Sequence, residues 1–142
     1  MTGKYLVDSN ILIYALDASG GEKHGKAAAF MEEAAYGGNA VLSTQNLVEF
    51  YANVTSPKKG EGLREDISMQ KLKELAETFE TVSYGSETIL EGARLHMEHK
   101  THFWDALLAA TMLENGIQVI YTENTKDFLK VPGIRAINPL KK

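Results

Sequence analysis

The chain has 142 residues, no cysteine and a formal net charge of −4. The absence of cysteine excludes a disulfide framework, thiolate metal ligands and a cysteine nucleophile, and the acidic balance argues against a protein that coats nucleic acid by bulk attraction. The length fits one domain, so we expect a single domain over residues 1–142.

The N-terminus reads MTGKYLVDSN, in which an apolar run of only three residues precedes an acid. Such a run is too short for a signal peptide or a membrane span, so we expect a cytoplasmic protein that does not engage a membrane.

Short apolar runs alternate with segments of helical spacing along the chain. In order, the pattern predicts a strand at 5–7, helices at 9–16 and 22–36, a strand at 41–42, helices at 44–54 and 68–78, a short strand at 81–83, helices at 86–99 and 104–114, and strands at 119–121 and, more weakly, 134–137. Residues 56–66, SPKKGEGLRED, are expected to form a surface loop within the domain. This alternation predicts an α/β fold with a mainly parallel sheet and helices on both faces.

Asp8 follows the first predicted strand directly, within KYLVDSNILIYAL. Ligands of parallel α/β sheets bind beyond the carboxyl ends of the strands, so this carboxylate is placed at the binding edge. The alternative is a helix cap, because Asp, Ser and Asn all satisfy free backbone donors at that position.

Glu49 lies in STQNLVEFYANV, where a polar stripe of Asn46, Glu49 and Asn53 borders an apolar helix face. That stripe can equally be the solvated side of the helix. Asp105 is predicted in the first turn of an apolar helix, where the helix dipole stabilises a negative charge even without a function.

A second polar cluster follows the strand at 119–121, where Asn124 and then Asp127 occupy the same predicted sheet edge. Two strand ends and two helix starts therefore carry oxygen ligands that can converge. Convergent carboxylates repel unless a proton or a cation compensates, and a hard divalent ion, Mg²⁺ or Mn²⁺, suits a site built from oxygen ligands. Such an ion supports phosphodiester hydrolysis by lowering the pKa of bound water.

These residues resemble the PIN domain family of the VapC toxin type. The resemblance lies in LVDSNILIYAL at 6–16, LSTQNLVEFYANVT at 42–55, FWDALLAA at 103–110 and YTENTKDF at 121–128, which span nearly the whole chain in the family's order. The resemblance implies a three-layer α/β/α fold, a Mg²⁺- or Mn²⁺-dependent ribonuclease acting on RNA, a homodimer, and a cognate antitoxin that inhibits it.

Carried over from the family, Asp8, Glu49 and Asp105 match its three core acids and are the expected metal ligands. Many relatives have Asp where this chain has Asn124, and Asp127 offers a nearby carboxylate, so both remain candidates to complete the site. We expect one firmly held ion and a second recruited with the substrate.

Two classes of function stay open: a toxin endoribonuclease, and a PIN-fold module that binds RNA or protein through a weakened site. A phosphatase or receiver domain is disfavoured, because DSN lacks the second Asp of a DxD motif and no Lys follows a late strand.

Several other residues stand out in the sequence but need no role in the site. His96, His99 and His102 are expected on the surface and not in a zinc site, because three-residue steps around a helix turn the ligands apart. RNA contact by Lys58, Lys59 or Arg64 is no better supported than plain solvation, and Trp104 is expected in the core or in a dimer contact rather than stacked on a base.

Overall fold

The computed structural model describes residues 3–56 and 64–141. Its sheet contains five strands: β1 (Tyr5–Val7), β2 (Ala40–Ser43), β3 (Glu80–Val82), β4 (Val119–Tyr121) and β5 (Arg135–Ile137). Their order is β3-β2-β1-β4-β5, and every neighbouring pair is parallel. The predicted parallel sheet is therefore confirmed.

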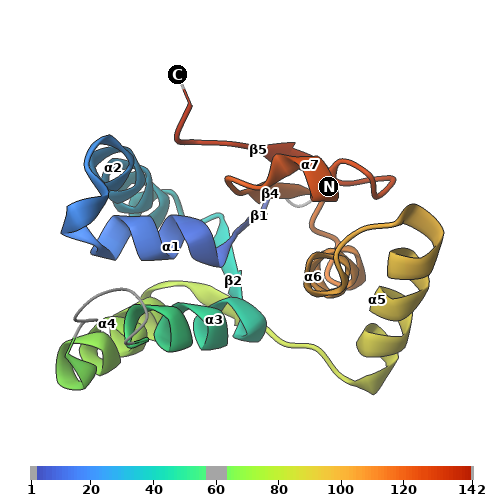
Figure 1. The fold of residues 1–142 in the computed structure, drawn as a ribbon, viewed down its shortest axis with the longest axis horizontal. Coiled ribbons are helices and arrows are strands. Elements are labelled where there is room, and N and C mark those ends of the chain that lie inside the picture. Colours follow the sequence, from blue (N-terminus) through green and yellow to red (C-terminus); the bar gives the residue numbers. More distant parts are fainter. Residues whose placement is uncertain (1–2, 57–63, 142) are drawn as a thin grey trace.

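Helices cover both faces of this sheet (Figure 1). They are α1 (Ser9–Leu16), α2 (Glu22–Gly37), α3 (Thr44–Val54), α4 (Glu65–Thr78), α5 (Ser86–His99), α6 (Phe103–Glu114) and the short α7 (Thr125–Phe128), with one 3₁₀ turn at Ala18–Gly20. None of the helices in the described part of the chain combines the length and apolar character needed to cross a membrane.

Two hydrophobic cores lie on opposite faces of the sheet. Leu6 and Ile120 belong to the core that contains buried residues of α5 and α6, whereas Val7 and Leu42 belong to the core formed with α1, α2 and α3. Successive residues of a strand point to opposite faces, so strands buried on both sides are apolar throughout. The result is the three-layer α/β/α arrangement that the sequence predicts.

Some predicted boundaries differ from the structure. Helix α4 begins at Glu65, three residues before the predicted start, because Glu65 and Asp66 are favoured in a first turn by the helix dipole. The end of the predicted loop at 56–66 is thus helical, and residues 57–63 of that loop lie outside the described residues. Helix α7 and the 3₁₀ turn were not predicted, because each is too short to show a hydrophobic period.

The residues that directly follow three of the parallel strands lie at one edge of the sheet. Strand β1 lies between β2 and β4, so Asp8 after β1, Thr44 after β2 and Thr122 after β4 meet at the carboxyl edge of the sheet. Helices α1 and α3 begin at this edge, and they bring their first turns to the same place.

Candidate active site

Asp8 is buried at the start of α1, with only 6 % of its surface exposed. Its Oδ1 accepts hydrogen bonds from the Ser9 backbone N (2.8 Å) and the Asn46 Nδ2 (3.3 Å), and its Oδ2 accepts one from the Thr122 Oγ1 (2.8 Å). The carboxylate therefore caps α1, as the alternative interpretation of the sequence proposed, and it also joins β1, α3 and the end of β4.

Burial raises the pKa of Asp8 to about 6. Hydrogen bonds from Thr122 and Ser9 oppose this rise, and the nearby charge of Glu49 adds to it. All of the donors that contact Asp8 in the described residues are uncharged. These neighbours thus orient the Asp8 carboxylate without neutralising its negative charge.

Glu49 projects from α3 toward the first turn of α1. Its Oε1 accepts a hydrogen bond from the Ser9 Oγ (3.0 Å), and its Oε2 accepts a long one from the Gln45 Nε2 (3.5 Å). The Gln45 Nε2 also donates to the Trp104 carbonyl (2.9 Å), which ties α3 to α6. Glu49 is only partly buried, so it remains accessible from the edge of the sheet.

The alternative that the polar stripe on α3 is a solvated face is wrong for Asn46, which is fully buried. Its Oδ1 accepts hydrogen bonds from the Ser43 backbone N and hydroxyl, and its own backbone N donates to the Ser43 Oγ, so the two residues form a capping box. An amide that satisfies a helix terminus in this way can be buried, which a count of polar positions does not reveal.

Asp105 lies in the first turn of α6, as predicted. The Asn124 Nδ2 donates to its Oδ2 at 2.9 Å and, more weakly, to the Asp127 Oδ2 at 3.4 Å. Burial, and after it the charges of Asp8, Asp127 and Glu49, raise the pKa of Asp105 to about 7. The pKa of Asp127 is lowered instead. Burial acts to raise this pKa, but hydrogen bonds from Asn124 and Lys130 outweigh that effect.

The structure thus brings all five predicted site residues to one region. Asp8 and Glu49 share Ser9 as a donor, Asp105 and Asp127 share Asn124, and the charges of the two pairs act on each other. Within residues 3–56 and 64–141, no three Asp, Glu, His or Cys side chains come close enough together to enclose a metal ion.

The chemistry of the donors nevertheless fits a hard divalent cation. The acids offer oxygen ligands only, and burial together with the charges of Asp8, Asp127 and Glu49 raises the pKa of Asp105, so a cation beside it would be favoured. Substrate phosphate or water oxygens can complete the coordination of such an ion, which protein side chains seldom do alone for Mg²⁺.

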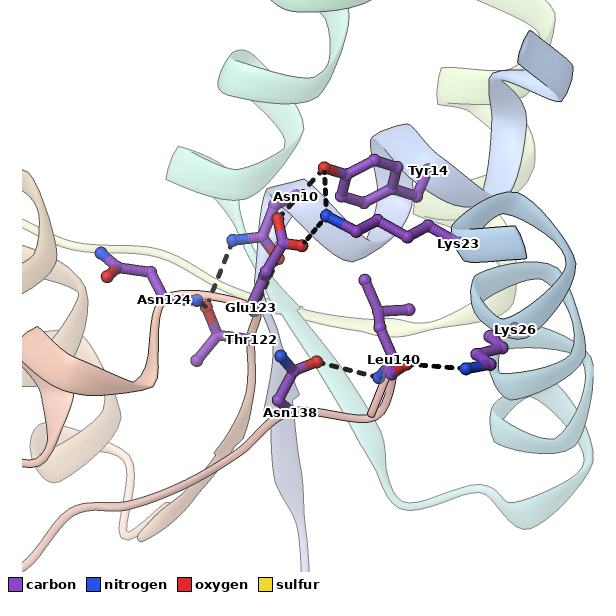
Figure 2. Close-up of polar contacts among 9 residues, drawn as sticks. All are labelled: Asn10, Tyr14, Lys23, Lys26, Thr122, Glu123, Asn124, Asn138 and Leu140. Atoms are coloured by element: carbon purple, nitrogen blue, oxygen red, sulfur yellow. Dashed lines mark hydrogen bonds and ion pairs between the residues drawn. The ribbon is translucent and has the colours of Figure 1, made fainter. Parts of the chain in front are cut away.

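The uncharged residues that hold the acids in place had no predicted role in the site. The most central is Thr122, whose hydroxyl contacts Asp8, Asn10 and Asn124, and Figure 2 shows its contacts with Asn10 and Asn124. A signal was present, because Thr122 is a polar residue directly after a buried strand, as Asp8 is after β1.

The histidines of HMEHKTH take no part in this site as the described residues form it. The His96 Nδ1 lies 2.6 Å from the Thr101 carbonyl, and His99 and His102 join no metal-binding group in the described chain. Trp104 is 50 % exposed, so the first of its two predicted places, the core, is wrong, whereas the second, a dimer contact, stays a prediction. Its ring contacts Phe103 edge-on. Arg64 pairs with Asp66, whereas Lys58 and Lys59 lie outside the described residues.

The sequence matches the PIN domain family over residues 5–134. The chain therefore belongs to the PIN domain family, which confirms the resemblance seen in the sequence. A comparison with curated proteins finds no significant match.

Solved structures of toxin–antitoxin proteins are similar to this chain. A toxin–antitoxin complex from Klebsiella pneumoniae matches with 25 % identity and a TM-score of 0.68, covering 96 % of this chain and 98 % of that one. VapBC2 from Rickettsia felis, bound to a DNA fragment from its promoter, matches with 19 % identity and a TM-score of 0.68, covering 94 % and 97 %. VapC20 from Mycobacterium tuberculosis, a toxin that cleaves the sarcin–ricin loop, matches with 15 % identity and a TM-score of 0.69, covering 87 % and 92 %. The last two likenesses show the shared fold.

Proposed function

We propose that the protein is a metal-dependent endoribonuclease and the toxin component of a type II toxin–antitoxin system. One observation carries the proposal: four acids meet at the carboxyl edge of the sheet, where Asp8 and Glu49 share Ser9 as a donor and Asp105 and Asp127 share Asn124. Membership of the PIN domain family and similarity to the Klebsiella pneumoniae toxin–antitoxin complex support it.

In this proposal Asp8, Glu49 and Asp105 hold Mg²⁺ or Mn²⁺. A divalent ion bound there would lower the pKa of water and neutralise charge on the scissile phosphate. The protein's own part is to fix the carboxylates: Ser9 and Gln45 orient Glu49, and Asn124 orients Asp105.

Asp127 is the better candidate for a fourth carboxylate. The Asn124 Nδ2 donates to Asp105 and Asp127, so the nitrogen of this amide is engaged with the two acids, and Asn124 brings no negative charge of its own to a cation. Asn124 therefore acts on the site by orienting two acids, and the charge supplied by Asp in many relatives comes here from a side chain one helical turn further on.

Four further parts of the proposal are based on the PIN domain family and on exposed apolar side chains. We propose a single PIN domain over residues 1–142, RNA as the substrate, a cytoplasmic location and a homodimer. Val48 on α3 and Trp104 on α6 expose 68 % and 50 % of their surfaces, and apolar side chains left open in this way are suited to a contact between two copies.

The cognate antitoxin is proposed to lie in a groove formed by α1, α2, α3 and α4. The groove has a volume of about 470 Å³, its walls include Leu16, Met31, Phe50 and Leu75, and exposed charged side chains of α2 and α4 lie at its rim. An apolar groove with a charged rim accepts the apolar face of an amphipathic helix.

A PIN-fold module that binds RNA or protein without cleaving it is the second candidate. The observation that favours it is Asn124, which stands where many relatives carry Asp. The same experiment separates the two functions.

The test is RNA cleavage by the purified protein with Mg²⁺ or Mn²⁺. We expect cleavage that EDTA abolishes, and an Asp105→Asn variant that is inactive although its circular dichroism spectrum shows it folded, because a charged ligand is lost. Cleavage that resists EDTA, or that persists in the variant, would contradict this mechanism, and binding of RNA without cleavage would favour the second candidate.

A further inference from the structure

Thr122 is fully buried where β4 ends, and three polar atoms surround its hydroxyl. The Asp8 Oδ2 lies at 2.8 Å, the Asn124 backbone N at 3.0 Å and the Asn10 Nδ2 at 3.2 Å. Figure 2 shows the Asn10 amide reaching from α1 to Thr122.

The position of the hydroxyl hydrogen follows from counting donors. A backbone N–H and an amide NH₂ can only donate, so the Thr122 oxygen accepts from Asn124 and Asn10. A hydroxyl has one hydrogen, and of these three neighbours among the described residues only the carboxylate of Asp8 can accept it. The proton of Thr122 is therefore directed at the Asp8 Oδ2.

The orientation of the Asn10 amide is fixed independently. Its Oδ1 accepts a hydrogen bond from the Glu123 backbone N at 3.2 Å. A flipped amide would face this N–H with its own NH₂ group, so the Glu123 backbone decides the orientation of Asn10.

Side chains of α1 and α2 hold the segment that carries Thr122. The Glu123 carboxylate accepts a hydrogen bond from the Tyr14 hydroxyl (3.1 Å) and pairs with Lys23 (2.5 Å), as Figure 2 shows. Lys23 is half exposed, so this ion pair adds little to stability. The contacts of Asn10 and Tyr14, which are partly buried on α1, fix residues 122–124 more firmly.

From this geometry we infer that Thr122 and Asn10 are positioning residues, which set the Asp8 carboxylate and the Asn124 side chain relative to each other. One oxygen atom donates to Asp8 and accepts from Asn124, whose side chain holds Asp105. The inference rests on the proposed function only in naming these acids as metal ligands.

The first test compares Thr122→Val, which keeps the shape and removes the hydroxyl, with Thr122→Ser, which restores it. Loss of a residue that orients metal ligands lowers metal affinity or activity about 10- to 100-fold. We expect this loss for Thr122→Val in Mn²⁺ affinity by calorimetry and in kcat for RNA cleavage, with KM for RNA unchanged. Thr122→Ser should restore both values.

Thr111→Val is the matched control. Thr111 is also fully buried, but its hydroxyl donates to the Leu107 carbonyl within α6. It should lose stability and keep Mn²⁺ affinity and kcat. Equal losses in Thr111→Val and Thr122→Val, or no rescue by Ser, would show that Thr122 is a packing residue and would overturn the inference.

Asn10→Ala tests the second positioning residue, because this substitution removes the amide without disturbing the core. If Asn10 acts through Thr122, the double variant with Thr122→Val should be no worse than Thr122→Val alone. Losses that multiply would contradict a shared role.

A metal-free measurement keeps the inference separate from the proposed function. In apo protein the side-chain amide NMR signals of Asn10 and Asn124 should shift in Thr122→Val and stay in place in Thr111→Val. Unshifted signals would overturn the inference. If the wild-type protein bound no Mn²⁺ and cleaved no RNA, the proposed function would fail, and the NMR result would still decide the roles of Thr122 and Asn10.

Discussion

The carboxylate of Asp105 is placed where a negative charge is unfavourable for the protein alone. Burial and the charges of Asp8, Asp127 and Glu49 raise its pKa to about 7 from an ordinary value of 3.8. Sites that bind a cation commonly trade stability for function in this way. The metal-free protein is therefore expected to lose stability as this group ionises.

The sign of that pH dependence follows from proton binding. Between pH 4 and pH 7 the folded state holds more protons at Asp105 than the unfolded state, so the free energy of unfolding falls as the pH rises through this interval. Asp105→Asn removes the effect. In EDTA we expect the variant to be more stable than wild type above pH 7, on the order of 1–2 kcal/mol after allowing for solvent screening of this partly buried group.

Urea unfolding at pH 4 and at pH 8 measures the difference directly. The advantage of Asp105→Asn should be present at pH 8 and absent at pH 4. An advantage of the same size at both values would mean that the substitution acts through packing and not through the charge.

Metal binding is the second prediction at this scale. Asp8→Asn should weaken Mn²⁺ binding measured by titration calorimetry, because the site loses a charged oxygen ligand. Asp66→Asn is a suitable control, since Asp66 is an exposed acid on α4 that pairs with Arg64. Unchanged Mn²⁺ affinity in Asp8→Asn would remove Asp8 from the proposed ligand set.

Single residues also show how far the sequence can predict the site. The positions of Asp8 after a strand and Asp105 in a first turn follow from local pattern alone, and the structure places both residues so. The bond from Asn10 to Thr122 joins residues 112 positions apart and depends on the register of β1 against β4. Such a contact has no local signature.

At the scale of elements, the placement of Asp105 depends on close packing of α5 against α6. A Cβ atom added at Gly92 on α5 would lie 3.0 Å from the Leu107 Cα and 3.3 Å from its N. These are backbone atoms, which cannot turn aside as the end of a flexible side chain can. Gly92 therefore sets the distance between the two helices.

Gly92→Ala should destabilise the protein by about 1–3 kcal/mol, because the helices must separate to admit a methyl group. Gly25→Ala is the matched control: Gly25 lies inside α2, and a Cβ there meets no atom within 4 Å. Ala in an exposed helix is about 0.5–1 kcal/mol more favourable than Gly, so the control should gain stability. Denaturant unfolding measures both, and a neutral Gly92→Ala would contradict the tight contact.

The elements were more predictable than their ends. Apolar runs buried on both faces gave the order of strands and helices that the structure confirms. Helix α7 escaped prediction because four residues carry no periodic signal, and α4 began early because its first turn contains only charged residues and one isoleucine. Boundaries of this kind depend on capping and on the helix dipole more than on hydrophobic pattern.

The whole molecule carries a net charge of −4, and part of that charge is concentrated at the carboxyl edge of the sheet. An inhibitor of the proposed nuclease must meet this negative potential. A positive side chain fits it, and the fork of an arginine suits bidentate pairing with carboxylates.

We therefore expect an antitoxin whose C-terminal segment, disordered when free, folds along the groove and across α3, and directs an Arg or Lys at Asp8 and Asp105. A disordered inhibitor is readily cut by proteases, which would release the nuclease. The test is to co-purify the pair, replace that Arg or Lys with Ala, and assay RNA cleavage at equal complex concentration. Cleavage that returns while the complex stays intact would support inhibition by charge. Full inhibition by the variant would show that the antitoxin acts by covering or distorting the site, because the apolar groove contacts alone would then hold it in place.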